Sequence, residues 1–143
     1  MMKRRVFLAL AAATAGGGFF ACRRFLRALD QARSGIGQPA GSVATRHGRM
    51  EWGQRGAGPP LLMLHGTGGG FDQGLLFTER LSGAGWRVIA PSRFGYLGTA
   101  MPAAPSAAKE ADALADLLDH LGIDRLPVIG GSAGALPAIE LAI

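Results

Sequence analysis

Cysteine is nearly absent from this sequence, and several other features that would indicate a particular function are missing. Cys22 is the single cysteine among 143 residues, which excludes an internal disulfide and a cysteine-based zinc site. The chain has no Gly-Lys-Ser/Thr triplet and therefore no P-loop. Neither of its two Gly-rich corners completes the Gly-x-Gly-x-x-Gly fingerprint of dinucleotide binding. We therefore expect neither a metal nor an organic cofactor.

Basic residues are scarce in the rear of the chain. Residues 1–55 hold ten Lys/Arg and two Asp/Glu, whereas residues 56–143 hold five Lys/Arg and eight Asp/Glu. A nucleic-acid-binding domain needs a basic patch on its folded surface. The region patterned as a folded domain is mildly acidic instead, so we expect no nucleic-acid partner.

The front segment, residues 1–27, has the layout of a bacterial export signal or membrane anchor. Three basic residues precede an apolar stretch, residues 6–21, and arginines follow it. The run from Arg4 to Leu8 resembles the twin-arginine export motif, and the run from Phe19 to Cys22 is faintly similar to a bacterial lipobox. The alternative of a buried helix is disfavoured by the flanking charges. We expect an exported protein, either periplasmic after cleavage or anchored in the inner membrane.

The remainder divides into a linker, residues 28–44, and a folded domain, residues 45–143. In the linker, Gly, Pro and Ser interrupt any periodic pattern of apolar residues. Short alternating segments from Val43 onward predict a hairpin. Three continuous apolar runs predict strands buried on both faces: residues 61–66, 86–92 and 126–131. Between them we expect a helix from Asp72 to about Ser82, and a second helix capped by Ser106 that ends at Gly122.

The alternation of strand and helix predicts the α/β class. Consecutive parallel strands joined by helices require right-handed crossovers, which place helices on both faces of the sheet. The expected architecture is a three-layer fold with a mostly parallel sheet.

A serine framed by glycines follows the third apolar run, in the sequence Gly130-Gly131-Ser132-Ala133-Gly134. A nucleophile at a tight turn between strand and helix needs small residues two places before and after it, because larger ones would collide with neighbouring backbone. The start of a helix also adds positive potential where an oxyanion would form. The corner therefore indicates nucleophilic catalysis.

These motifs resemble the N-terminal half of an α/β-hydrolase, truncated after the nucleophile elbow. His65-Gly66 is similar to the family's oxyanion-loop motif, the segment from Pro91 to Thr99 resembles its next strand–loop, and Gly130 to Gly134 matches the elbow. The resemblance implies that Ser132 is the nucleophile. It also implies that the N–H groups of Ala133 and Thr67 form the oxyanion hole, with the N–H of Gly68 as an alternative to that of Thr67.

A general base is not evident in the sequence. The family order is Ser, then Asp or Glu, then His, but only Glu140 follows Ser132 and no histidine does. We expect His65 to brace the oxyanion loop, His47 to be solvated, and His120 to sit at a helix end away from the elbow. The acid and base are therefore expected downstream, and the 143-residue chain alone is expected to be inactive.

The favoured function is hydrolysis of a small carboxylic ester by acyl transfer to water. Serine at the elbow argues against dehalogenase and epoxide-hydrolase chemistry. Carbon–carbon bond hydrolases and cofactor-free haloperoxidases stay open. Two alternatives of another class are a non-catalytic domain of the same fold that binds a ligand or partner at the membrane, and a chain whose front helix is its functional part.

Overall fold

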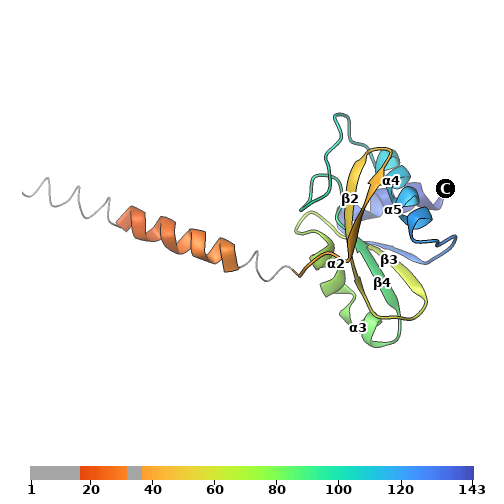
Figure 1. Ribbon diagram of the computed structural model, residues 1–143, viewed down its shortest axis with the longest axis horizontal. Coiled ribbons are helices and arrows are strands. Elements are labelled where there is room, and N and C mark those ends of the chain that lie inside the picture. Colours follow the sequence, from red (N-terminus) through yellow and green to blue (C-terminus); the bar gives the residue numbers. More distant parts are fainter. Residues whose placement is uncertain (1–16, 32–36) are drawn as a thin grey trace, which may run out of the picture. The chain divides into compact units, whose positions relative to one another are not determined.

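The computed structural model describes residues 17–31 and 37–143, which fall into two units, Met1–Gly37 and Gln38–Ile143 (Figure 1). In the front unit, residues 17–31 form one helix. Residues 1–16, which carry most of the predicted signal or anchor, lie outside the described residues. Within the described ranges, no helix combines the length and the hydropathy needed to cross a bilayer.

The predicted linker, residues 28–44, is too long at both ends. The front helix continues to residue 31, and strand β1 (Gly41–Thr45) already pairs with β2 (Gly48–Arg55). Gly41 pairs with Trp52, and a Cβ at Gly41 would come within 2.7 Å of the Trp52 ring. Glycine, which in the linker prediction indicated a loop, here lets the ring lie close to the strand.

The rear unit is built on a five-stranded sheet in the order β1-β2-β4-β3-β5. The remaining strands are β3 (Pro60–Leu64), β4 (Arg87–Pro91) and β5 (Val128–Gly130). Strands β1, β2 and β4 pair antiparallel in succession, whereas β3 pairs parallel with both β4 and β5. The predicted hairpin and the mostly parallel arrangement of the later strands are confirmed.

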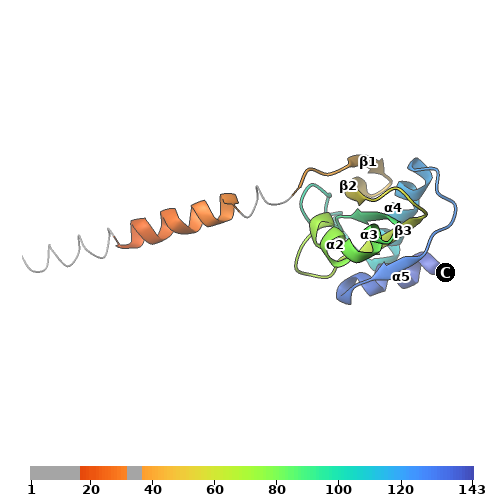
Figure 2. The same ribbon diagram turned by 90° about the horizontal axis from the view of Figure 1, so that it is seen from below.

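Helices cover both faces of the sheet. Because side chains alternate along a strand, Leu61 and Met63 of β3 pack on one face with Leu75 and Leu81 of the helices that follow it. The neighbours Leu62 and Leu64 point to the other face, where they join residues of α4 (Ala107–His120) and α5 (Ala135–Ala142) in the larger core cluster. Figure 2 shows the sheet edge-on between these helices. The three-layer prediction is confirmed.

The helix expected from Asp72 to Ser82 is instead two short helices, α2 (Phe71–Phe77) and α3 (Glu79–Gly83). They separate at Thr78, whose buried hydroxyl donates to the Gly74 carbonyl oxygen at 2.7 Å. A hydroxyl that bonds a carbonyl one turn earlier competes with the helical ladder. Asp72 lies inside the first turn of α2, where its carboxylate accepts from the Gly70 N–H.

Helix α4 (Ala107–His120) matches its prediction. The Ser106 hydroxyl accepts a hydrogen bond from the Lys109 N–H and caps the first turn. Gly122, with φ of +66°, ends the helix in the left-handed conformation that glycine adopts readily. This helix packs against α5 (Ala135–Ala142), as Figure 1 shows.

Strand β5 differs from its prediction, because it is not buried on both faces. It pairs with β3 on one side, and among the described residues no strand pairs with its other side. Ile129 in this strand is 37% exposed. An apolar run alone does not distinguish a central strand from one at an edge.

Candidate active site

Ser132 occupies a sharp corner between strand and helix. Strand β5 ends at Gly130, a short 3-10 helix η1 (Ser132–Gly134) follows, and α5 begins at Ala135. Ser132 is exposed and has φ of +50°. A left-handed serine is strained by about 1–3 kcal/mol and persists only where its surroundings impose it. This corner, residues 130–134, is called the Ser132 corner below.

Two glycines make the corner sterically possible. A Cβ at Gly130 would lie 2.6 Å from the Ala135 Cα, and a Cβ at Gly134 would lie 2.6 Å from the His65 carbonyl oxygen. In both cases the obstructing atom belongs to backbone, which cannot swing aside as a flexible side chain does. Residues of any larger size at these two positions would displace the serine.

The Ser132 corner lies directly against the loop that follows β3. The Gly131 N–H donates to the Leu64 carbonyl oxygen at 2.9 Å. A Cβ on Gly66 would sit 3.2 Å from the Ser132 Cβ and 3.8 Å from its Oγ. The structure thus brings together Ser132 and residues 66–68, here called the 66–68 loop, which are 64 or more positions apart in the chain.

His65 is fully buried and bonded through both ring nitrogens. Its Nε2 accepts from the Arg93 N–H at 2.9 Å, so the proton resides on Nδ1, which donates to the Gly66 carbonyl oxygen at 2.7 Å. Burial, with the nearby positive charge of Arg93, lowers the pKa of His65 below its ordinary value. A neutral, fully bonded imidazole fixes the loop, as expected for this residue, and has no nitrogen free to take a proton.

Tyr96 holds the next peptide of the same loop. Its ring meets the His65 ring edge-on, with 4.8 Å between the ring centroids. Its hydroxyl donates to the Thr67 carbonyl oxygen at 3.3 Å. Thr67 itself is exposed. Within the described part of the chain, no acceptor is bonded to the Thr67 N–H. Ala133 lies within the Ser132 corner, in the first turn of η1, where helical N–H groups lack partners within the helix.

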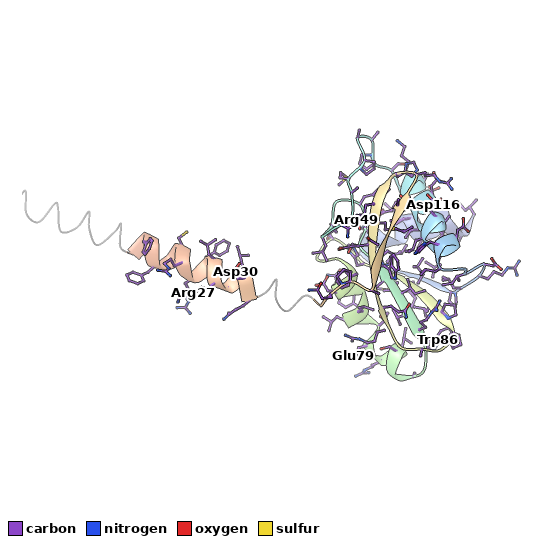
Figure 3. The ribbon with its side chains drawn as sticks, viewed as in Figure 1. Arg27, Asp30, Arg49, Glu79, Trp86 and Asp116 are labelled. Atoms are coloured by element: carbon purple, nitrogen blue, oxygen red, sulfur yellow. The ribbon has the colours of Figure 1, made fainter. Side chains whose placement is uncertain are left out.

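His47 is partly buried and has a side-chain partner, rather than being simply solvated as predicted. Its Nε2 lies 3.2 Å from an Asp112 carboxylate oxygen, and its ring meets Phe94 edge-on. The adjacent Arg46 binds Asp116 through its guanidinium and its N–H. These contacts attach the β1–β2 turn to α4, and Figure 3 shows Asp116 at the same end of the domain as Arg49 of β2.

His120 also has a partner away from the Ser132 corner. It lies in the last turn of α4, and its ring meets the Trp52 ring edge-on at 5.7 Å. All three histidines are therefore engaged by groups other than Ser132.

An ion pair between the loop after β4 and helix α4, next to His65, was not predicted from the sequence. Arg93 and Glu110 lie 17 positions apart, and their side chains meet at 2.9 Å. The Glu110 carboxylate also accepts from the Phe94 N–H. No local pattern pairs a loop residue with a helix residue at this separation, because the contact arises only when α4 folds over the sheet.

The geometry agrees with a comparison to known protein families. The family model described as alpha/beta hydrolase fold matches residues 59–143, which include β3, the 66–68 loop and the Ser132 corner. The chain belongs to the alpha/beta hydrolase fold family.

Relatives within this family are hydrolases by name. The chain is 34% identical over 105 residues to epoxide hydrolase 3 of Siraitia grosvenorii, covering 68% of this chain and 32% of that protein. A solved alpha/beta hydrolase fold protein from Nakamurella multipartita is 35% identical with a TM-score of 0.67, covering 71% of this chain and 35% of that one. An N-acyl homoserine lactonase complexed with N-butanoyl homoserine is 34% identical with a TM-score of 0.61, covering 71% and 39%. The chain spans about a third of the length of the curated relatives it matches.

Proposed function

We propose that the protein is a serine hydrolase that cleaves small carboxylic esters by transferring the acyl group to water. The observation that carries the proposal is the left-handed, exposed Ser132, held against the 66–68 loop. Backbone strain at an exposed nucleophilic side chain is maintained by its surroundings, and such strain concentrates at active sites. Membership of a hydrolase family supports the same conclusion.

The reaction begins when the Ser132 Oγ attacks the ester carbonyl carbon and its proton passes to a base. The carbonyl oxygen becomes an oxyanion that accepts hydrogen bonds from the N–H groups of Ala133 and Thr67. The intermediate collapses to an acyl-serine and releases the alcohol. Water then repeats the attack and releases the acid.

The base in this proposal is a histidine outside these 143 residues. His47, His65 and His120 all have other partners. A serine without a base is a weak nucleophile at neutral pH, so we propose that residues 1–143 alone do not turn over substrate. The catalytic acid is likewise assigned to further chain, in keeping with the greater length of the relatives.

Esters are favoured over epoxides although some relatives are named epoxide hydrolases. Attack by serine on an epoxide would form an ether, which water does not readily cleave. Attack by serine on an ester forms another ester, which water can hydrolyse in a second step. A lactone is a cyclic ester, so the substrate class of the similar lactonase falls within the proposal.

The test compares two lengths of the protein with p-nitrophenyl acetate and butyrate. We expect hydrolysis by the natural-length protein, loss of at least about 1,000-fold in kcat on Ser132→Ala, and no turnover by residues 1–143. Equal turnover by the Ser132→Ala variant would rule out Ser132 as the nucleophile. Serine-dependent turnover by the short form would show that the base lies inside it.

We also propose that residues 1–27 direct export to, or anchoring in, the bacterial inner membrane. Support comes from the basic ends of the segment and from its apolar stretch, residues 6–21. Fractionation of cells that express the protein with and without residues 1–27 tests this. The intact form should be periplasmic or membrane-bound and the shortened form cytoplasmic, whereas the same distribution of both would refute the proposal.

A further inference from the structure

One carboxylate on α4 binds both the side chain and the backbone of the corner after β4. Glu110 is only 3% exposed. Its Oε2 accepts from the Arg93 Nε at 3.2 Å and Nη2 at 2.9 Å. Its Oε1 accepts from the Phe94 N–H at 2.9 Å. Both carboxylate oxygens are therefore used to hold residues 93–94 in one position.

From this corner a chain of hydrogen bonds runs to the 66–68 loop. The Arg93 N–H donates to the His65 Nε2, and the His65 Nδ1–H donates to the Gly66 carbonyl oxygen. In a trans peptide the N–H points opposite to the C=O of the same unit. Binding the Gly66 carbonyl to the imidazole therefore directs the Thr67 N–H away from His65.

We propose that Glu110 is a positioning residue for the 66–68 loop. By holding residues 93–94 it keeps the Arg93 N–H on His65 Nε2, which fixes the imidazole tautomer that binds the Gly66 carbonyl and so orients the Thr67 N–H. This inference rests on the proposed function, in which that N–H binds the oxyanion. Glu110 acts through Arg93 and His65 and touches no substrate.

Stability alone is a weak reason for this ion pair. Removing two charges from water costs several kcal/mol per ion, and buried pairs are often replaceable by apolar side chains without loss of stability. The carboxylate instead supplies geometry, because it bonds the arginine side chain and the next backbone N–H at once. A second buried carboxylate, Glu51, accepts from the Ser92 hydroxyl and the Gly98 N–H, and within the described residues it bonds neither Arg93 nor Phe94. It provides a matched control.

The first experiment measures the His65 tautomer by NMR of the imidazole nitrogens in residues 1–143. In the unaltered chain we expect the proton on Nδ1 only. In Glu110→Gln one carboxylate oxygen becomes an amide nitrogen, so a donor meets a donor at either the Arg93 guanidinium or the Phe94 N–H, and we expect a second tautomer or an exchanging ring. Glu51→Gln should leave the His65 ring unchanged. An unchanged tautomer in Glu110→Gln would overturn the proposal.

Arg93→Lys covers the case in which Glu110→Gln does not fold. The ammonium keeps the positive charge beside Glu110 but not the two-nitrogen contact. We expect a smaller change of the His65 ring in the same direction. An unaltered ring in a folded Arg93→Lys chain would contradict the proposal.

The second experiment uses the natural-length protein and the ester assay. Displacing one oxyanion donor should lower kcat by about 10- to 100-fold and change KM by less than about 2-fold. The double variant Glu110→Gln with His65→Asn should lower kcat no further than the more severe single variant does, because both residues act on one chain of contacts. Additive losses would contradict the proposal. If no Ser132-dependent turnover exists, the proposed function fails, and the ring spectra still decide the role of Glu110.

Discussion

The two flanks of Ser132 differ in how completely they are packed. On one flank, the loops after β3 and β4 are tied together by His65 and by the Arg93–Glu110 pair, and three of these hydrogen bonds measure 2.7–2.9 Å. On the other flank, strand β5 and helix α5 expose apolar side chains: Leu136 is 63% exposed and Ile139 is 61% exposed. One flank is fixed by buried polar contacts and the other presents an open apolar surface.

This difference affects how the two proposed oxyanion donors, the N–H groups of Thr67 and Ala133, are held in place. Donors that stabilise a developing charge are effective when they are oriented before the reaction, so that no reorganisation is needed. The contacts that would orient the Thr67 N–H are already complete within these residues. The open flank supplies the other proposed donor, the Ala133 N–H, at the start of η1. The two proposed donors are therefore held differently: the Thr67 N–H by buried side chains of neighbouring loops, and the Ala133 N–H by its place in the first turn of a helix.

The largest expected effect comes from truncating one side chain of β3, the strand that leads into the tied loops, and one side chain of α5, on the open flank. Leu62 of β3 is fully buried, so Leu62→Ala should lower the free energy of unfolding by about 2–5 kcal/mol. Ile139→Ala on α5 should change it by less than about 0.5 kcal/mol, because the side chain is mostly exposed. Urea denaturation of the 143-residue chain measures both. Similar losses from the two variants would show that the flanks do not differ in packing.

A second pair of variants tests the close approach at the Ser132 corner. Gly134→Ala drives a Cβ into the Leu64 carbonyl oxygen, and the resulting displacement should cost about 1–3 kcal/mol or more. Gly83→Ala on α3 meets no atom within 4 Å and should raise stability by up to about 1 kcal/mol. Thermal unfolding followed by circular dichroism ranks the two. A Gly134→Ala chain as stable as Gly83→Ala would refute the described corner.

A smaller effect is expected from relieving the left-handed backbone at Ser132. Ser132→Gly should raise the free energy of unfolding by about 0.5–1 kcal/mol, since glycine adopts φ of +50° without a Cβ penalty. Ser106→Gly is the matched control at a residue with φ of −150° that caps α4, and it should cost a few tenths of a kcal/mol. Loss of stability in Ser132→Gly would mean that the corner is unstrained.

The smallest expected effect is a pH dependence from the buried flank. The pKa of His65 is lowered by burial, so the unfolded chain takes up a proton at a higher pH than the folded chain does. Stability should be full above about pH 6.5 and fall as the pH decreases toward the folded pKa. Asp116, whose pKa is lowered by its hydrogen bond with Arg46, stabilises the fold at higher pH and begins to lose that contribution only below about pH 4. The urea midpoints at pH 7.5 and pH 5 should therefore differ less in His65→Asn than in the unaltered chain. An identical difference in both would contradict the attribution of this pH dependence to His65.

Much of the fold followed from local patterns. The apolar runs predicted β3 and β4, and Ser106 and Gly122 predicted the two ends of α4. The Ser132 corner was predicted because glycine spacing around a serine reflects a steric requirement of the local backbone. The split at Thr78 was missed because a hydroxyl–carbonyl bond is one of several that a threonine can form.

The missed parts of the candidate site depend on contacts distant in sequence. The His47–Asp112 contact and the Arg93–Glu110 pair join loops to α4, and nothing in a single sequence specifies which face of a helix meets which loop. The exposure of β5 depends on what lies beside it, which its own residues do not encode. The expected function of His65 was recoverable because its neighbour Gly66 belongs to a motif.

The most direct test of Ser132 as the nucleophile is covalent labelling of the natural-length protein with a fluorophosphonate. Attack by Oγ on phosphorus expels fluoride and leaves a stable adduct, which mass spectrometry of peptides locates. We predict one adduct, on Ser132, and none in Ser132→Ala. An adduct on another residue, or ester hydrolysis by a protein whose Ser132 stays unlabelled, would contradict the account.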